Sequence, residues 1–117
     1  MIGKLYGVVI DCPEPLVLAR FYSELLGLPI TSEDDDWVDI GDGDPLRLSF
    51  QLAPDHRPPR WPDPAHPQQF HLDVEVDDVE IAEKAVLAAG ATRLPGEGTS
   101  FRVYADPAGH PFCLTWG

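Results

Sequence analysis

The chain has 117 residues, which is a typical length for one domain, and 44% of them are hydrophobic, enough for a core. Its formal net charge of −12 argues against nucleic acid and anionic membranes as partners, because both are bound through lysine and arginine. The same charge suits a cationic ligand, or it only keeps the protein soluble. No run of about 18 apolar residues predicts a membrane span. Because no signal-peptide pattern opens the chain, we expect a cytoplasmic protein in which Cys12 and Cys113 are free thiols.

The first half predicts a strand, a helix and three further strands. Residues 5–10 are rich in strand formers, and the prolines within residues 11–15 end that strand. Residues 29–31, 37–40 and 46–52 predict strands, and the last two flank a glycine-rich hairpin turn. The helix is indicated by apolar residues spaced at i, i+3, i+4, i+7 and i+8, with a glycine behind them: Leu18, Phe21, Tyr22, Leu25, Leu26 and Gly27.

Residues 53–67 form a proline-rich connection without strand or helix patterning. It is either a linker between the halves or a rim over a site. Trp61 within it either packs on the body of the protein or contacts a ligand.

The second half repeats the order of the first. Residues 69–78 alternate between polar and apolar, which predicts a strand with His71, Asp73 and Glu75 on one face. A helix follows with Asp77 as its cap, and Gly90 ends it. Residues 91–94 predict a short strand, residues 95–98 a turn, and residues 101–104 and 111–116 a hairpin.

The two halves align at a spacing of 64 residues, so that Gly7 corresponds to His71 and Ser49 to Cys113. We therefore expect one domain, residues 1–117, made of module one (1–52), the connection (53–67) and module two (68–117). One face of each sheet packs under its helix: Tyr6, Val8, Ile10, Val38, Ile40, Leu48, Phe50, Leu72, Val74, Val76, Phe112, Leu114 and Trp116. The other face lines the inside of a curved sheet: Leu5, Gly7, Val9, Asp11, Trp37, Asp39, Arg47, Ser49, Gln51, His71, Asp73, Glu75, Phe101, Val103, Cys113 and Thr115.

The chain resembles the vicinal oxygen chelate superfamily in three features: this repeat, the Leu26-Gly27-Leu28 helix end and the turn over residues 106–112. That group includes glyoxalase I, bleomycin resistance proteins and extradiol dioxygenases, and residues 59–64 and 68–73 resemble its small glyoxalase-like subgroup. The resemblance covers essentially the whole chain. It implies an α+β fold in which two tandem βαβββ modules form a curved, half-barrel-like mixed sheet with the helices outside.

In the metal-using members that the chain resembles, the first and fourth strands of each module supply one metal ligand apiece. The corresponding residues here are Gly7, Ser49, His71 and Cys113. His71 matches in residue type, and a Cys113 thiolate prefers softer ions. Gly7 has no donor atom and Ser49 is a poor ligand. We therefore expect no cofactor in the usual four-ligand site, although a divalent metal held by His71 and Cys113, with Asp73 or Glu75 as a third ligand, stays an alternative.

Three functions are compatible with these residues. The first is a metal-free protein that binds a small molecule, similar to the bleomycin resistance proteins that sequester cationic antibiotics. The second is a lyase, isomerase or dioxygenase for a small oxygenated substrate, with His71, Asp73 and Glu75 as catalytic residues. In the third, His71 and Cys113 serve packing alone. The expected ligand-binding residues are Trp37, Asp39, Arg47, Ser49, Gln51, Phe101 and Cys113. Unpaired sheet edges favour a homodimer.

Overall fold

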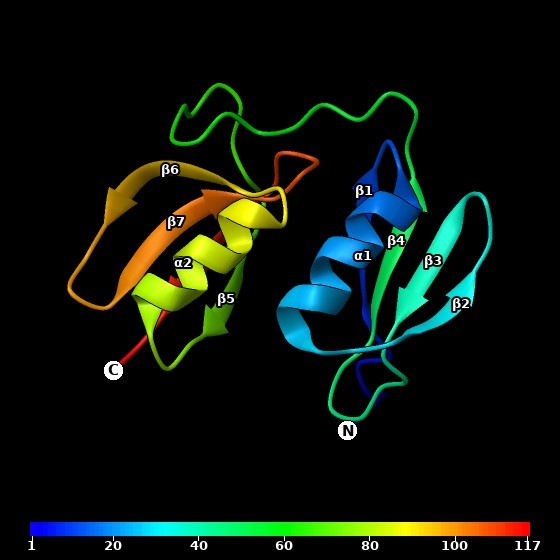
Figure 1. The fold of residues 1–117 in the computed structure, drawn as a ribbon. Coiled ribbons are helices and arrows are strands. Elements are labelled where there is room, and N and C mark those ends of the chain that lie inside the picture. Colours follow the sequence, from blue (N-terminus) through cyan, green and yellow to red (C-terminus); the bar gives the residue numbers. More distant parts are fainter. The chain divides into compact units, whose positions relative to one another are not determined.

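The computed structural model describes residues 1–117, and its elements occur in the predicted order of two βαβββ modules (Figure 1). The α+β fold expected from the sequence is confirmed. The chain divides into two compact units, residues 1–56 and 57–117. The first unit contains β1 (Val8–Cys12), α1 (Pro15–Leu26), β2 (Ile30–Glu33), β3 (Trp37–Ile40) and β4 (Leu48–Leu52). The second contains β5 (Leu72–Glu75), α2 (Val79–Ala88), β6 (Thr92–Glu97), β7 (Phe101–Ala105) and β8 (Pro111–Thr115).

The two units share one sheet topology. The strand order is β1-β4-β3-β2 in the first sheet and β5-β8-β7-β6 in the second. In each sheet the first strand pairs parallel with the fourth, and the other pairs are antiparallel. This identity confirms that the 64-residue spacing reflects one structural unit used twice.

In the first unit, α1 packs on its sheet through apolar side chains. Pro15 occupies the first turn, where its missing N–H costs nothing, and Gly27 ends the helix with a φ of 69° and an N–H bonded to Ser23 O. The Tyr22 ring stacks on Phe50 with centroids 5.7 Å apart. As predicted, one face of the sheet contributes buried apolar side chains: Ile10, Val38, Ile40, Leu48 and Phe50.

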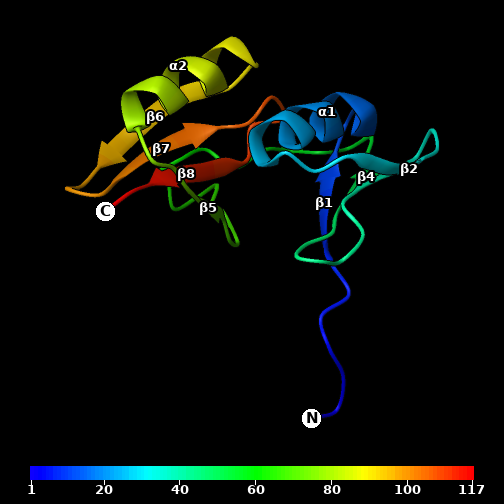
Figure 2. The same ribbon diagram turned by 60° about the horizontal axis from the view of Figure 1, so that its bottom comes forward.

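In the second unit, α2 lies over one face of the sheet (Figure 2) and buries fewer of its residues than α1 does. Val86 is its only buried residue. The sheet itself buries Tyr104, Phe112 and Leu114, and the first two rings stack with centroids 5.6 Å apart. The hairpin turn between β7 and β8 is held by the buried Asp106 carboxylate, which accepts the backbone N–H groups of Ala108 and His110.

Three local predictions were wrong. The first strand begins at Val8 and runs through Cys12, and Tyr6, placed in the core from the sequence, is 76% exposed. The cap of α2 is Asp78, whose carboxylate accepts the N–H groups of Glu80 and Ile81, whereas Asp77 was predicted. Residues 95–97, predicted as a turn, continue β6 through an irregular pairing with β7.

The proline-rich connection contains no helix or strand, as predicted. Trp61 is fixed to the second unit, because its indole N–H donates to Pro95 O in β6 at 2.7 Å. Cys12 and Cys113 are both buried free thiols, which confirms that expectation.

Candidate functional site

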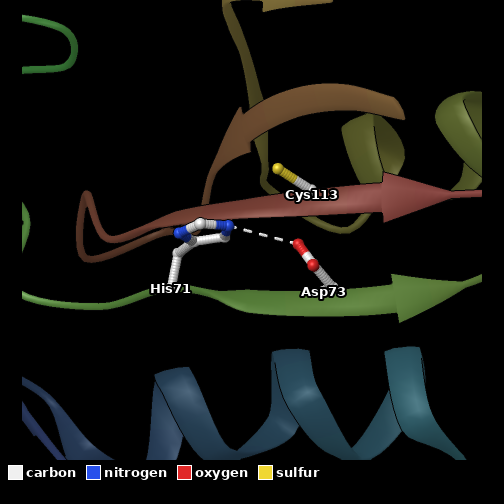
Figure 3. A group of neighbouring side chains, drawn as sticks. All are labelled: His71, Asp73 and Cys113. Carbon is white, nitrogen blue, oxygen red and sulfur yellow. Dashed lines mark ion pairs between the residues drawn. The ribbon is translucent and has the colours of Figure 1, made fainter. Parts of the chain in front are cut away.

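The face of each sheet opposite its helix, here called the helix-distal face, carries the predicted site residues. In the second unit it is formed by His71, Asp73, Glu75, Phe101, Val103, Cys113 and Thr115. On this face the nitrogen, oxygen and sulfur atoms of His71, Asp73 and Cys113 lie within 4.8 Å of one another (Figure 3). Asp73 and Cys113 are direct neighbours on the parallel strands β5 and β8. His71 precedes β5 by one residue, and its Nε2 lies 3.2 Å from Asp73 Oδ1.

Asp73 is the central group of this cluster. Burial of the Cys113 thiol raises its pKa to about 11, and the Asp73 carboxylate adds to the rise through its charge and a hydrogen bond. Cys113 is therefore a protonated thiol near neutral pH. A cysteine nucleophile needs a lowered thiol pKa, and here burial and the Asp73 carboxylate raise it although the His71 ring also lies within 4.8 Å. The cluster therefore does not form an activated cysteine.

Glu75, the third predicted catalytic residue, lies outside this cluster. It is exposed and pairs with Thr115, one pleat beyond the Asp73–Cys113 pair. Phe101 pairs with Thr115 from the other side and is 38% exposed. The second unit thus combines a His-Asp-Cys cluster with a carboxylate and an aromatic ring further along the same face.

In the first unit the helix-distal face carries Val9, Asp11, Trp37, Asp39, Ser49 and Gln51. The Trp37 indole N–H donates to Asp39 Oδ1 at 2.7 Å, and the Ser49 hydroxyl donates to the same oxygen at 2.5 Å. Ser49 is only 4% exposed. Three predicted ligand-binding residues therefore form one hydrogen-bonded group, in which Asp39 Oδ2 keeps acceptor capacity. Gln51 is exposed and pairs with Trp37.

Arg47 interacts with backbone and with a neighbouring ring of its own unit. Its guanidinium donates to Asp42 O at 2.6 Å and to Tyr6 O at 3.2 Å. It also lies over the Tyr6 ring, 3.8 Å from the centroid. These contacts hold the residues before β1 against the β3–β4 turn. Arg47 is the only Lys or Arg that the sequence analysis assigned to the ligand-binding face, and its guanidinium is occupied by these contacts.

The four superfamily metal positions do not fit an ion as a set. Gly7 has no donor atom, and a Cβ placed there would lie 3.0 Å from Arg47 O. The Ser49 hydroxyl is bonded to Asp39. Only His71 and Cys113 offer metal-binding atoms, and their third partner is Asp73 within the same unit. These three donors all come from one module. In the metal-using members of the superfamily, each module supplies two of the four ligands.

An ionic cluster that the sequence analysis missed lies between α2 and the opposite face of the second sheet. Glu83 accepts hydrogen bonds from Arg93, from Arg102 and from the Tyr104 hydroxyl, at 2.7, 3.0 and 2.8 Å. Glu80 adds a second bond to Arg102 at 2.7 Å. The sequence pattern could have indicated this cluster. Glu80 and Glu83 lie three residues apart, on the same helix face as the apolar residues Val79 and Val86.

Neither α1, with 12 residues, nor α2, with 10, could span a lipid bilayer. A model of the glyoxalase-like domain family matches residues 7–115. No curated protein matches the chain in a sequence comparison.

Solved structures share the fold at low identity. An enzyme of the glyoxalase/bleomycin resistance protein/dioxygenase family from Burkholderia phytofirmans PsJN is 18% identical, with a TM-score of 0.76 over 97% of this chain and 98% of that one. The bleomycin-binding protein of Streptomyces verticillus, in complex with copper(II)-bleomycin, is 22% identical, with a TM-score of 0.58 over 100% and 99%. The fosfomycin resistance protein FosX of Mesorhizobium loti is 14% identical, with a TM-score of 0.73 over 100% and 94%.

Proposed function

Because this chain belongs to the family of glyoxalase-like domains, we propose that it binds small cationic molecules at the helix-distal face of a sheet. The proposal places no metal ion in the usual four-ligand arrangement, since two of the four positions lack a usable donor. We also propose that the protein is cytoplasmic and forms a homodimer. Each sheet ends in two edge strands, and these favour association.

One observation carries this proposal: the helix-distal faces combine carboxylates with aromatic rings, and their one Lys or Arg, Arg47, is already engaged. The carboxylates are those of Asp11, Asp39, Asp73 and Glu75. A cation is attracted by carboxylates and by the faces of aromatic rings such as Trp37 and Phe101. The net charge of −12 also draws cations to the protein and raises their rate of association.

The fold of the bleomycin-binding protein is consistent with an antibiotic-sequestering version of this function. Sequestration needs affinity without turnover. The raised pKa of Cys113, about 11, keeps its thiol protonated near neutral pH, which is compatible with a binding protein of this kind.

A thermal-shift series in EDTA tests the proposal. We expect metal-free bleomycin and benzyltrimethylammonium to raise the melting temperature, because ligands that bind the folded state stabilise it. Phenylacetate, an anion of similar size, should leave the melting temperature unchanged. Equal shifts with phenylacetate, or none with any cation, would contradict a cation-binding function.

The second candidate is a lyase, isomerase or dioxygenase, and the His71-Asp73-Cys113 cluster is the observation that favours it. Asp73 lies 3.2 Å from Nε2 of the partly exposed His71 imidazole and orients the ring, which leaves Nδ1 as the nitrogen to accept or donate a substrate proton. Glutathione adducts of 2-oxoaldehydes, and catechols, are the substrates to assay. Turnover that is abolished in His71→Ala would support this candidate, and its absence with every metal offered would exclude it for these substrates.

A further inference from the structure

We propose that the second unit alone holds one divalent transition-metal ion of the zinc class, through His71, Asp73 and Cys113. The three residues come from β5, the position just before it, and β8, so both strands of one parallel pair fix them. This centre goes beyond cation binding at the helix-distal faces, and it departs from a site that takes two ligands from each module.

The separation of the three donor atoms is the first support. A tetrahedral zinc ion has bonds of about 2.0–2.3 Å, which places its ligand atoms roughly 3.3–3.8 Å apart. The distance from His71 Nε2 to Asp73 Oδ1 is already 3.2 Å, and no pair within the cluster exceeds 4.8 Å. The side chains of His71 and Asp73 are 37% and 61% exposed, so both can rotate slightly toward an ion.

The chemistry of the donor set is the second support. One imidazole nitrogen, one carboxylate oxygen and one thiolate sulfur suit Zn²⁺ or Co²⁺, whereas Mg²⁺ and Ca²⁺ prefer oxygen ligands alone. Binding displaces the thiol proton of Cys113, which passes to solvent. Three protein ligands leave a coordination position open, as in metal centres that accept an exogenous molecule.

The first unit offers no usable donor at the two positions that correspond to His71 and Cys113. Gly7 has no side chain, and the Ser49 hydroxyl is held by Asp39. Mutations can therefore distinguish the three-ligand centre from a site that uses the four superfamily positions. Loss of Asp73 should weaken binding strongly, and loss of Ser49 should not affect it.

Cobalt binding to the untagged, full-length protein tests the inference. We expect one Co²⁺ per chain, with a sulfur-to-cobalt charge-transfer absorption in the near ultraviolet. Cys113→Ser should remove that band. His71→Ala and Asp73→Ala should weaken binding by more than about 100-fold, because even a residue that only supports a metal ligand is worth about 10–100-fold in affinity.

Two matched controls should bind cobalt as the unaltered protein does. His66→Ala removes a His–Asp pair with the same 3.2 Å separation but no neighbouring cysteine, and Ser49→Ala removes the corresponding position of the first unit. Less than about a tenth of an ion per chain, unchanged affinity in Asp73→Ala, or weakened affinity in Ser49→Ala would overturn the inference. The EDTA-treated protein still reports on cationic ligands, so failure of one proposal is distinguishable from failure of the other.

Discussion

Two aspartates on the helix-distal faces have opposite surroundings. Asp39 receives hydrogen bonds from Trp37 and from the nearly buried Ser49, so its carboxylate holds β3 and β4 side chains in place. Asp73 is 61% exposed and lies near both the His71 imidazole and the Cys113 thiol. Asp39 is thus fixed by its neighbours, whereas Asp73 adds to the raised pKa of one neighbour, Cys113.

Asp73→Asn should lower the pKa of Cys113 from about 11, because it removes a negative charge that disfavours the thiolate. The pKa should stay above the ordinary thiol value of 9.0, since burial is the larger cause. The pH dependence of iodoacetamide alkylation, followed at Cys113 by peptide mass spectrometry in EDTA, measures this shift. Glu75→Gln, one pleat away on the same face, is the control and should leave the midpoint unchanged. A midpoint that is unchanged or higher in Asp73→Asn would refute this role of Asp73.

Asp39→Ala should lower the free energy of unfolding by about 1–3 kcal/mol, because it leaves the Trp37 indole N–H and the Ser49 hydroxyl without their acceptor. Urea unfolding measures the change. Asp36→Ala removes an exposed carboxylate of the preceding turn and should cost less than about 0.5 kcal/mol. Equal effects in the two variants would show that Asp39 does not organise this face.

The two helices are attached to their sheets by different forces. Apolar side chains of α1, including Leu18, Phe21 and Tyr22, are almost completely buried. In α2 only Val86 is buried, and Glu83 connects the helix to β6 and β7 through three hydrogen bonds. The position of α2 therefore depends on charge far more than that of α1.

Glu83→Gln should destabilise the protein by about 1–2 kcal/mol at neutral pH, because hydrogen bonds to a charged acceptor are the stronger ones. The hydrogen bond from Tyr104 and the nearby arginines lower the pKa of Glu83 in the folded protein below 4.5. This contribution is therefore complete above pH 4.5 and is lost as the pH falls through the lowered folded pKa.

Unfolding curves across this pH range should accordingly converge for Glu83→Gln and the unaltered protein in acid. Glu80→Gln is the matched control. Its side chain is 69% exposed, so its loss should cost less than about 0.5 kcal/mol. A Glu83→Gln difference that stays constant down to pH 2–3 would contradict the ionic attachment of α2.

Alternation and the internal repeat were sufficient to predict most elements and to place His71, Asp73 and Cys113 on one face. They could not predict the start of β1, because its extent is set by parallel pairing with β4, in which Val8 lies opposite Leu48. Leu5 and Tyr6 are strand formers by type, but they lie before this pairing begins. The contacts of Glu83 also depended on tertiary packing, which brings Arg93 and Arg102 beneath α2.

At the scale of the whole molecule, a net charge of −12 and the acidic helix-distal faces favour cationic ligands. Affinity for benzyltrimethylammonium should fall as salt is raised from about 0.01 to 0.15 M, because screening shortens the reach of exposed charges from about 30 to 8 Å. Isothermal titration calorimetry at the two salt concentrations measures the change. Affinity that is independent of salt would indicate binding by apolar contact alone.

The most direct test of the cation-binding function is an NMR titration of the ¹⁵N-labelled protein with benzyltrimethylammonium in EDTA. We predict shifts of the Trp37 indole N–H and of backbone amides at Asp39, Ser49, Asp73 and Cys113, with α1 and α2 unperturbed. Phenylacetate at the same concentration should cause no comparable shifts. Shifts confined to the helices, or an equal response to phenylacetate, would contradict a cationic ligand on the helix-distal faces.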